Sequence, residues 1–240
     1  MTSFSTFSAL AFGFLLGLRH AVEADHLAAV STIVGERRSL LSSTLVGGLW
    51  GVGHTISLLL VGVAVIWFRF EVNERTALAL ELCVGVMLVG LGLNALRKLA
   101  RGGRVHLHVH RHGGRAHVHP HLHDPSTREE DPHTHHGLRL GARPLLVGAL
   151  HGLAGSAALM LLILSTIESR LAGLAYVVVF GVGSIGGMML MSALVGLPLY
   201  LTASRFSRAN LTVRGLAGLF SLSFGLFMIY EIGFVEGLFR

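Results

Sequence analysis

Residues 12–34 read FGFLLGLRHAVEADHLAAVSTIV, an apolar run that is interrupted in its middle by a short polar stretch. Five ionisable side chains fall within the eight residues of this interruption: Arg19, His20, Glu23, Asp25 and His26. Charged groups so deep in an apolar segment are energetically costly unless they are paired or bind a metal ion. The stretch therefore predicts a membrane-spanning segment that carries a functional site.

The rest of the chain is also typical of a membrane protein. Of its 240 residues, 52% are hydrophobic and 13% are charged, and the mean hydropathy is +0.67. A helix needs about 20 apolar residues to cross a bilayer. We expect an all-α, multi-pass protein of the cell membrane, with six spans near residues 4–34, 43–68, 77–97, 144–165, 171–200 and 212–234.

Two halves of the chain resemble each other. Residues 18–21 (LRHA) match residues 149–152 (ALHG), and residues 50–54 (WGVGH) match residues 180–184 (FGVGS), at offsets of 131 and 130. Two glycines at 85 and 92 match those at 218 and 225. With three spans each, the halves 1–97 and 144–240 would lie in opposite orientations, which is a 3+3 inverted repeat around the polar segment 98–143.

Basic residues are distributed unevenly between the expected loops. With the N-terminus outside, fourteen Lys and Arg residues lie on the cytoplasmic side and four on the other. This positive-inside bias places both termini outside the cytoplasm and segment 98–143 within it. It also explains the net charge of +6 without nucleic acid as a partner.

Histidine and carboxylate together are ligands that suit nickel, cobalt or zinc better than calcium or magnesium. On a continuous helix, Asp25 and His26 would lie about 140° and about 240° around from His20. Either the helix is unwound at this point, or the side chains divide between the ion and other partners. The candidate metal ligands are His20, Asp25, His26, His54 in the second span, Glu23, and His151, which aligns with His20.

Eleven of the 15 histidines lie in segment 98–143. Such density is typical of weak, multidentate metal capture, and we expect no regular structure there without metal. Facing the cytoplasm, the segment could buffer, present or sense metal. Its histidines are His106, His108, His110, His112, His117, His119, His121, His123, His133, His135 and His136.

The motif His20-x-x-x-x-Asp25-His26 resembles the signature of the nickel/cobalt transporter family. Residues 49–55 (LWGVGHT) resemble the family's second motif. The likeness extends to urease-accessory-type nickel permeases and to nickel/cobalt efflux proteins with a histidine loop. It implies transport of nickel or cobalt, with His20, Asp25 and His26 essential and His54 close by. Uptake is slightly favoured over efflux, although the long histidine segment is similar to the efflux branch.

The expected function is therefore that of a permease and not of an enzyme. No G-x-x-x-x-G-K-[ST] motif is present, so we expect no ATP hydrolysis on this chain. The alternatives are an intramembrane zinc-dependent enzyme, although H-E-x-x-H is absent, and a metal sensor without transport. Expected partners are the metal ion as substrate and the lipid bilayer. A cytoplasmic metallochaperone and a second copy of the chain are compatible with this function, and no organic cofactor is expected.

Overall fold

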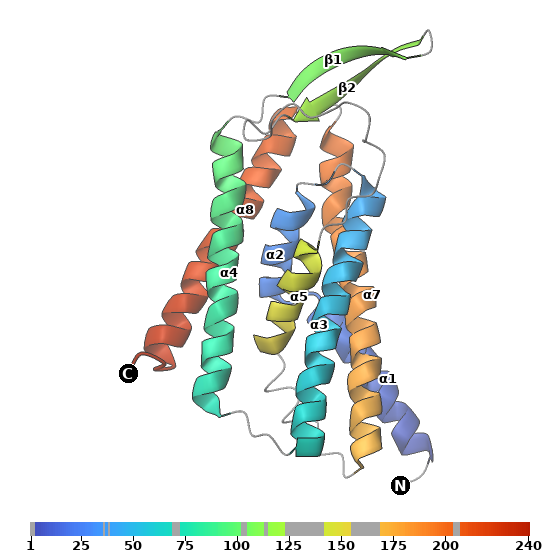
Figure 1. Cartoon of the computed structure of the whole chain (residues 1–240), viewed down its shortest axis with the longest axis vertical. Coiled ribbons are helices and arrows are strands. Elements are labelled where there is room, and N and C mark those ends of the chain that lie inside the picture. Colours follow the sequence, from blue (N-terminus) through green and yellow to red (C-terminus); the bar gives the residue numbers. More distant parts are fainter. Residues whose placement is uncertain are drawn as a thin grey trace.

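The structure is a computed structural model that describes residues 3–35, 37, 39–68, 73–101, 105–112, 115–122, 142–154, 169–203 and 207–240. Long helices lie side by side, and a two-stranded hairpin lies at one end of them (Figure 1). The long helices are α3 (Leu40–Phe68), α4 (Glu74–Ala100), α7 (Arg170–Ala203) and α8 (Ser207–Tyr230), the last followed by a π-helical turn, η1 (Glu231–Val235).

The first expected span is broken into two helices, α1 (Ser3–His20) and α2 (Ala24–Val34), whose axes differ by 55°. The break falls inside the charged stretch, between His20 and Ala24. α1, α2 and the short helix α5 (Arg143–Ala154) all have one end near the middle of the bundle (Figure 1).

Among the described residues, four helices are long and apolar enough to cross a membrane, and the broken pair α1–α2 brings the number to five. The fourth expected span, 144–165, is described only over α5, because residues 155–168 lie outside the described part of the chain. The arrangement of six spans thus stays a prediction, while the structure shows a helical protein whose described part has four or five segments able to cross a membrane.

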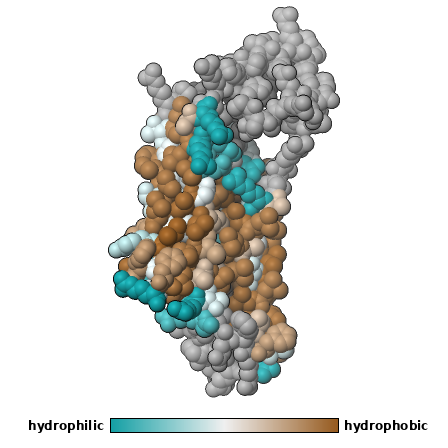
Figure 2. Space-filling model, turned by 60° about the vertical axis from the view of Figure 1, so that its left-hand side comes forward, coloured by the Kyte–Doolittle hydropathy of each residue, from teal (hydrophilic) through white to brown (hydrophobic). Residues whose placement is uncertain are grey.

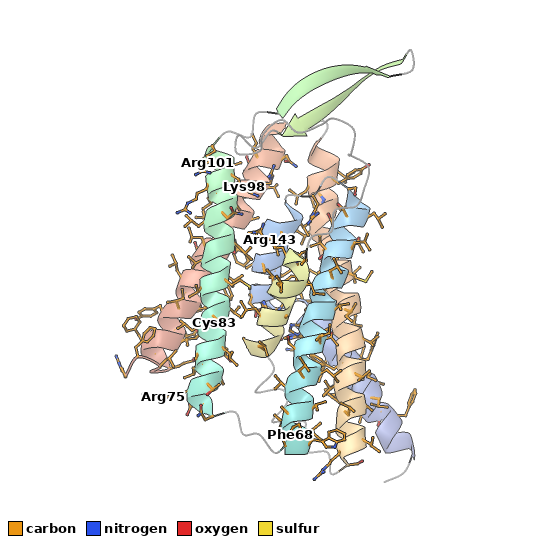
Figure 3. All side chains as sticks on the ribbon, in the orientation of Figure 1. Phe68, Arg75, Cys83, Lys98, Arg101 and Arg143 are labelled. Carbon is orange, nitrogen blue, oxygen red and sulfur yellow. The ribbon has the colours of Figure 1, made fainter. Side chains whose placement is uncertain are left out.

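The surface of the bundle suits a bilayer. Hydrophobic side chains form a broad belt between two hydrophilic zones (Figure 2), and large apolar residues such as Leu60, Phe68 and Leu171 are exposed. Lys98 and Arg101 lie near one end of the bundle, whereas Phe68 and Arg75 lie near the other (Figure 3). Lipid in place of water around the belt removes the cost of exposing these apolar groups.

Glycines allow the helices to approach closely, and they do so in matched pairs. A Cβ at Gly17 in α1 would overlap the carbonyl oxygen of Phe180 in α7, and one at Gly148 in α5 would overlap that of Trp50 in α3. These two contacts are related by offsets of 131 and 130 residues. Two further pairs of contacts are related in the same way: Gly53 on Leu145 with Gly183 on Phe14, at offsets of 130 and 131, and Gly92 on Gly218 with Gly225 on Gly85, at an offset of 133.

These contacts also fix the directions of the helices. Gly47 meets Met188 and Thr55 meets Gly181, so α3 and α7 run antiparallel. α5 runs parallel to α3, just as α1 runs parallel to α7 (Figure 1). α1 and α5 therefore each pack against a long helix from the other half of the chain. This packing brings residues that are far apart in sequence to the centre of the bundle.

The described part of the histidine-rich segment forms an antiparallel hairpin of β1 (Val105–His112) and β2 (Arg115–Leu122). This differs from the expected lack of regular structure. The physical reason is the alternation of His with Leu107, Val109 and Val118, a period of two that favours a strand. The register pairs three sets of histidine positions across the strands: His106 with His121, His108 with His119, and His110 with His117.

Candidate metal-binding site

The break between α1 and α2 brings the ligands of the charged stretch together. His20 ends α1, and the chain then turns through Val22 N–H to Arg19 O and Glu23 N–H to His20 O hydrogen bonds of 3.0 and 3.1 Å. Glu23 has extended backbone before α2 begins. The first of the two geometries left open by the sequence, an unwound helix, is the one observed.

Asp25 stands in the first turn of α2, where the positive end of the helix dipole favours a carboxylate. Its Oδ1 accepts a hydrogen bond from the backbone N–H of His26 at 2.8 Å and lies 3.1 Å from His26 Nδ1. Its Oδ2 lies 2.8 Å from His151 Nε2. One carboxylate thus links the first span to α5, 126 residues further along the chain.

Four histidines cluster here, two of them in contact with this carboxylate. His20 Nε2 lies 3.2 Å from His54 Nε2, and the rings of His26 and His151 are 4.1 Å apart between centroids. His26, His54 and His151 are buried almost completely. Imidazoles gathered so closely away from water are typical ligands of divalent transition metals.

The candidate ligand atoms form two sets, and the atoms of each set lie within 4.8 Å of one another. One set is His20, His26 and His54, and the other is Asp25, His26 and His151. Histidine nitrogens bind zinc at about 2.0–2.1 Å, so small side-chain movements would let either set close on an ion.

Within the described residues, three buried nitrogens of this cluster have no hydrogen-bond partner: His26 Nε2, His54 Nδ1 and His151 Nδ1. Buried polar atoms are nearly always satisfied in native proteins. Their number at one place fits a site that binds a ligand.

Glu23, expected among the ligands, does not join either set. Its carboxylate lies 3.0 Å from Nδ1 of His20, and its side chain is 55% exposed. A carboxylate on the far nitrogen of a ligating histidine orients the ring and selects its tautomer. The structure thus places the Glu23 carboxylate against Nδ1 of His20, outside both sets.

Two residues near the site had not been expected. The indole of Trp50 stacks on His26, with ring centroids 5.4 Å apart and an interplanar angle of 20°. Glu81 on α4 is partly buried and lies in the neighbourhood of two other carboxylates, those of Glu236 after η1 and of Asp25. A carboxylate inside a predicted span was the signal for Glu81, since such groups are rarely without a role.

The histidines of segment 98–143 are only partly placed. Those at 106, 108, 110, 112, 117, 119 and 121 belong to β1 and β2. His123, His133, His135 and His136 lie outside the described residues. Weak metal capture by this segment therefore stays a prediction.

Several apolar helices around a buried cluster of four histidines and an aspartate define a helical membrane protein with a candidate metal site. The chain is 36% identical to the urease accessory protein UreH of Bacillus sp. (strain TB-90), an alignment that covers 97% of this chain and 95% of that protein. It therefore belongs to the UreH family of urease accessory proteins.

Two more distant relatives come from Arabidopsis thaliana. They are the chloroplast proteins FOR GROWTH AND FERTILITY 1 and 2, which are 28% and 25% identical over 77% of this chain. The chain spans about half the length of each, 48% and 46%. No family model and no solved structure matches the chain.

Proposed function

We propose that this protein carries a divalent transition-metal ion, nickel or cobalt, across the membrane as a permease without ATP hydrolysis of its own. The observation that carries the proposal is the buried cluster of His20, Asp25, His26, His54 and His151 in the middle of a membrane bundle. Ionisable groups at such depth mark ion pathways far more often than they serve stability. Mixed imidazole and carboxylate ligands suit nickel and cobalt.

The relatives support the same substrate class. Urease is a nickel enzyme, so the simplest interpretation of a urease accessory protein is a role in nickel handling. This favours uptake into the compartment where urease is assembled over efflux. It also favours a carrier over an enzyme, since UreH is named for assisting another protein.

We further propose that the fold is a 3+3 inverted repeat with the site between its halves. The reciprocal contacts of Gly17 with Phe180 and Gly148 with Trp50 are those expected from a pseudo-two-fold axis in the membrane plane. Secondary transporters of this plan bind their substrate at the repeat interface, beside broken helices. The α1–α2 break next to the cluster fits this plan.

Flux in proteoliposomes of known protein orientation tests the proposal. Labelled nickel should cross without ATP, and His20→Ala should reduce the initial rate at least about tenfold, as loss of a ligand or of its support typically does. Matched vesicles with Ser221→Ala are the control, because this hydroxyl bonds Leu88 O at the α4–α8 contact, outside the cluster. Equal flux in wild type, His20→Ala and protein-free vesicles would disprove transport at this site.

A further inference from the structure

The two ligand sets share only His26, and they differ in which half of the chain supplies them. His20, His26 and His54 come from α1, α2 and α3, all of them before the histidine-rich segment. The second set needs His151 from α5, which follows that segment. The first set is therefore complete within one half, whereas the second exists only where the halves meet.

One pair of candidate ligand atoms in each set already has the spacing of ligands around one ion. Two nitrogens bound at about 2.05 Å in tetrahedral geometry lie about 3.3 Å apart, and His20 Nε2 and His54 Nε2 are 3.2 Å apart. His151 Nε2 and Asp25 Oδ2 are 2.8 Å apart, close to the separation of about 2.9 Å between neighbouring ligands at 90°. The rings of His54 and His151 are separated by 6.1 Å.

His26 can serve both sets because its two nitrogens have different surroundings. Nδ1 lies 3.1 Å from Asp25 Oδ1, whereas Nε2 has no hydrogen-bond partner among the described residues. Trp50 stacks on the ring and limits its tilt. One imidazole thus adjoins both the His20–His54 pair and the Asp25–His151 pair, with centroids 4.5 Å from His20 and 4.1 Å from His151.

We propose that the ion occupies two successive positions: a receiving position held by His20, His26 and His54, and a transfer position held by Asp25, His26 and His151. This inference rests on the proposed transport function and adds an order of events to it. The receiving position keeps its ligands when the halves separate. The transfer position forms only while α5 is docked on α3, a contact made by Gly148 and Gly152 against Trp50 and His54.

The two positions predict different effects of losing His54 and of losing His151. Loss of His54 should weaken equilibrium binding and, through it, flux. Loss of His151 should leave the receiving position intact, so that binding persists while flux falls. A single site that uses all five ligands would lose binding equally with either histidine.

The experiment measures Co²⁺ binding and Co²⁺ flux with the full chain, in which the eleven histidines of segment 98–143 are replaced by Asn so that binding reports the cluster. His151→Gln retains an amide donor for Asp25 but is a poor metal ligand, and His151→Ala removes both functions. We expect His151→Gln to bind Co²⁺ within about threefold of the parent and to transport it at least about tenfold more slowly. His54→Ala should weaken binding at least about tenfold.

Ser221→Ala is the control for loss of a buried polar contact and should change neither quantity. Gel filtration of each variant identifies any that fails to fold, in which case the other His151 variant decides. The proposal is overturned if His151→Gln weakens binding as much as His54→Ala does, or if it transports at the parent rate. A parent protein that binds Co²⁺ but moves none would instead refute the transport function, and it is measured first.

Discussion

Substituting Gly148 by alanine should disrupt the site from a distance. Gly148 lies on α5 one turn before His151, and a Cβ there would overlap the carbonyl oxygen and the indole of Trp50. Ordinary contact requires about 3.5 Å, so α5 must move away from α3 by more than about 1 Å. Such overpacking typically costs about 1–3 kcal/mol of stability.

The same shift acts on the metal ligands. His151 Nε2 lies 2.8 Å from Asp25 Oδ2, and a displacement of about 1 Å takes this pair beyond hydrogen-bond distance. We expect Gly148→Ala to lower the thermal midpoint and to reduce nickel flux per folded molecule at least about tenfold, because ligands misplaced by about 1 Å bind poorly.

Gly90→Ala is the matched control. Gly90 lies on α4 with no heavy atom within 4 Å of an added Cβ, and alanine favours a helix over glycine by about 1 kcal/mol. This variant should be as stable as wild type or more so, with unchanged flux. A Gly148→Ala protein that melts and transports like Gly90→Ala would show that the site does not depend on close packing of α5 on α3.

Three further outcomes follow from the site. Glu23→Gln should slow transport less than His20→Ala, by about tenfold, the lower end of the range for a group that orients a ligand, because Glu23 is half exposed to solvent. Flux at saturating nickel measures this, and a loss as large as that of His20→Ala would make Glu23 a ligand. Trp50→Ala should destabilise the fold by about 3–5 kcal/mol, as loss of a buried aromatic does, whereas Trp50→Phe should retain most of the stacking on His26. Thermal melting measures the difference, and equal melting midpoints of the two variants would contradict this prediction. Deleting residues 106–136 should lower flux at low nickel but not at saturation, since capture alone is lost; a lower saturated rate would contradict this.

The break in the first span was one of two geometries that the helical period left open. Asp25 and His26 could not face the same point as His20 on a continuous helix, and the chain turns between Arg19 and Glu23. Ligation by Asp25 and His26 themselves stays a prediction, but the approach of His26 to His20 and His54 does not depend on that outcome.

Contacts across the two halves could be foreseen only in outline. The repeat aligned His151 with His20, yet nothing in the sequence indicated that His151 would reach Asp25 and not His54. That contact depends on how closely α5 packs on α3, which is set by overlaps at Gly148 and Gly152. The stacking of Trp50 on His26 depends on the same packing.

The hairpin shows how composition can conceal a pattern. The many histidines of residues 105–122 suggested an unstructured tract, while their alternation with Val and Leu already had the period of a strand. Glu81 was passed over for a related reason, because a single carboxylate contributes little to the hydropathy of a span.

Anomalous diffraction from crystals of the cobalt-loaded protein, recorded at the cobalt absorption edge, tests the central claim most directly. If the buried cluster is the transport site, an anomalous peak should lie within about 2.5 Å of ligand atoms from His26 and from His54 or His151. Peaks confined to the histidine-rich segment, with none at the cluster under saturating cobalt, would contradict the claim.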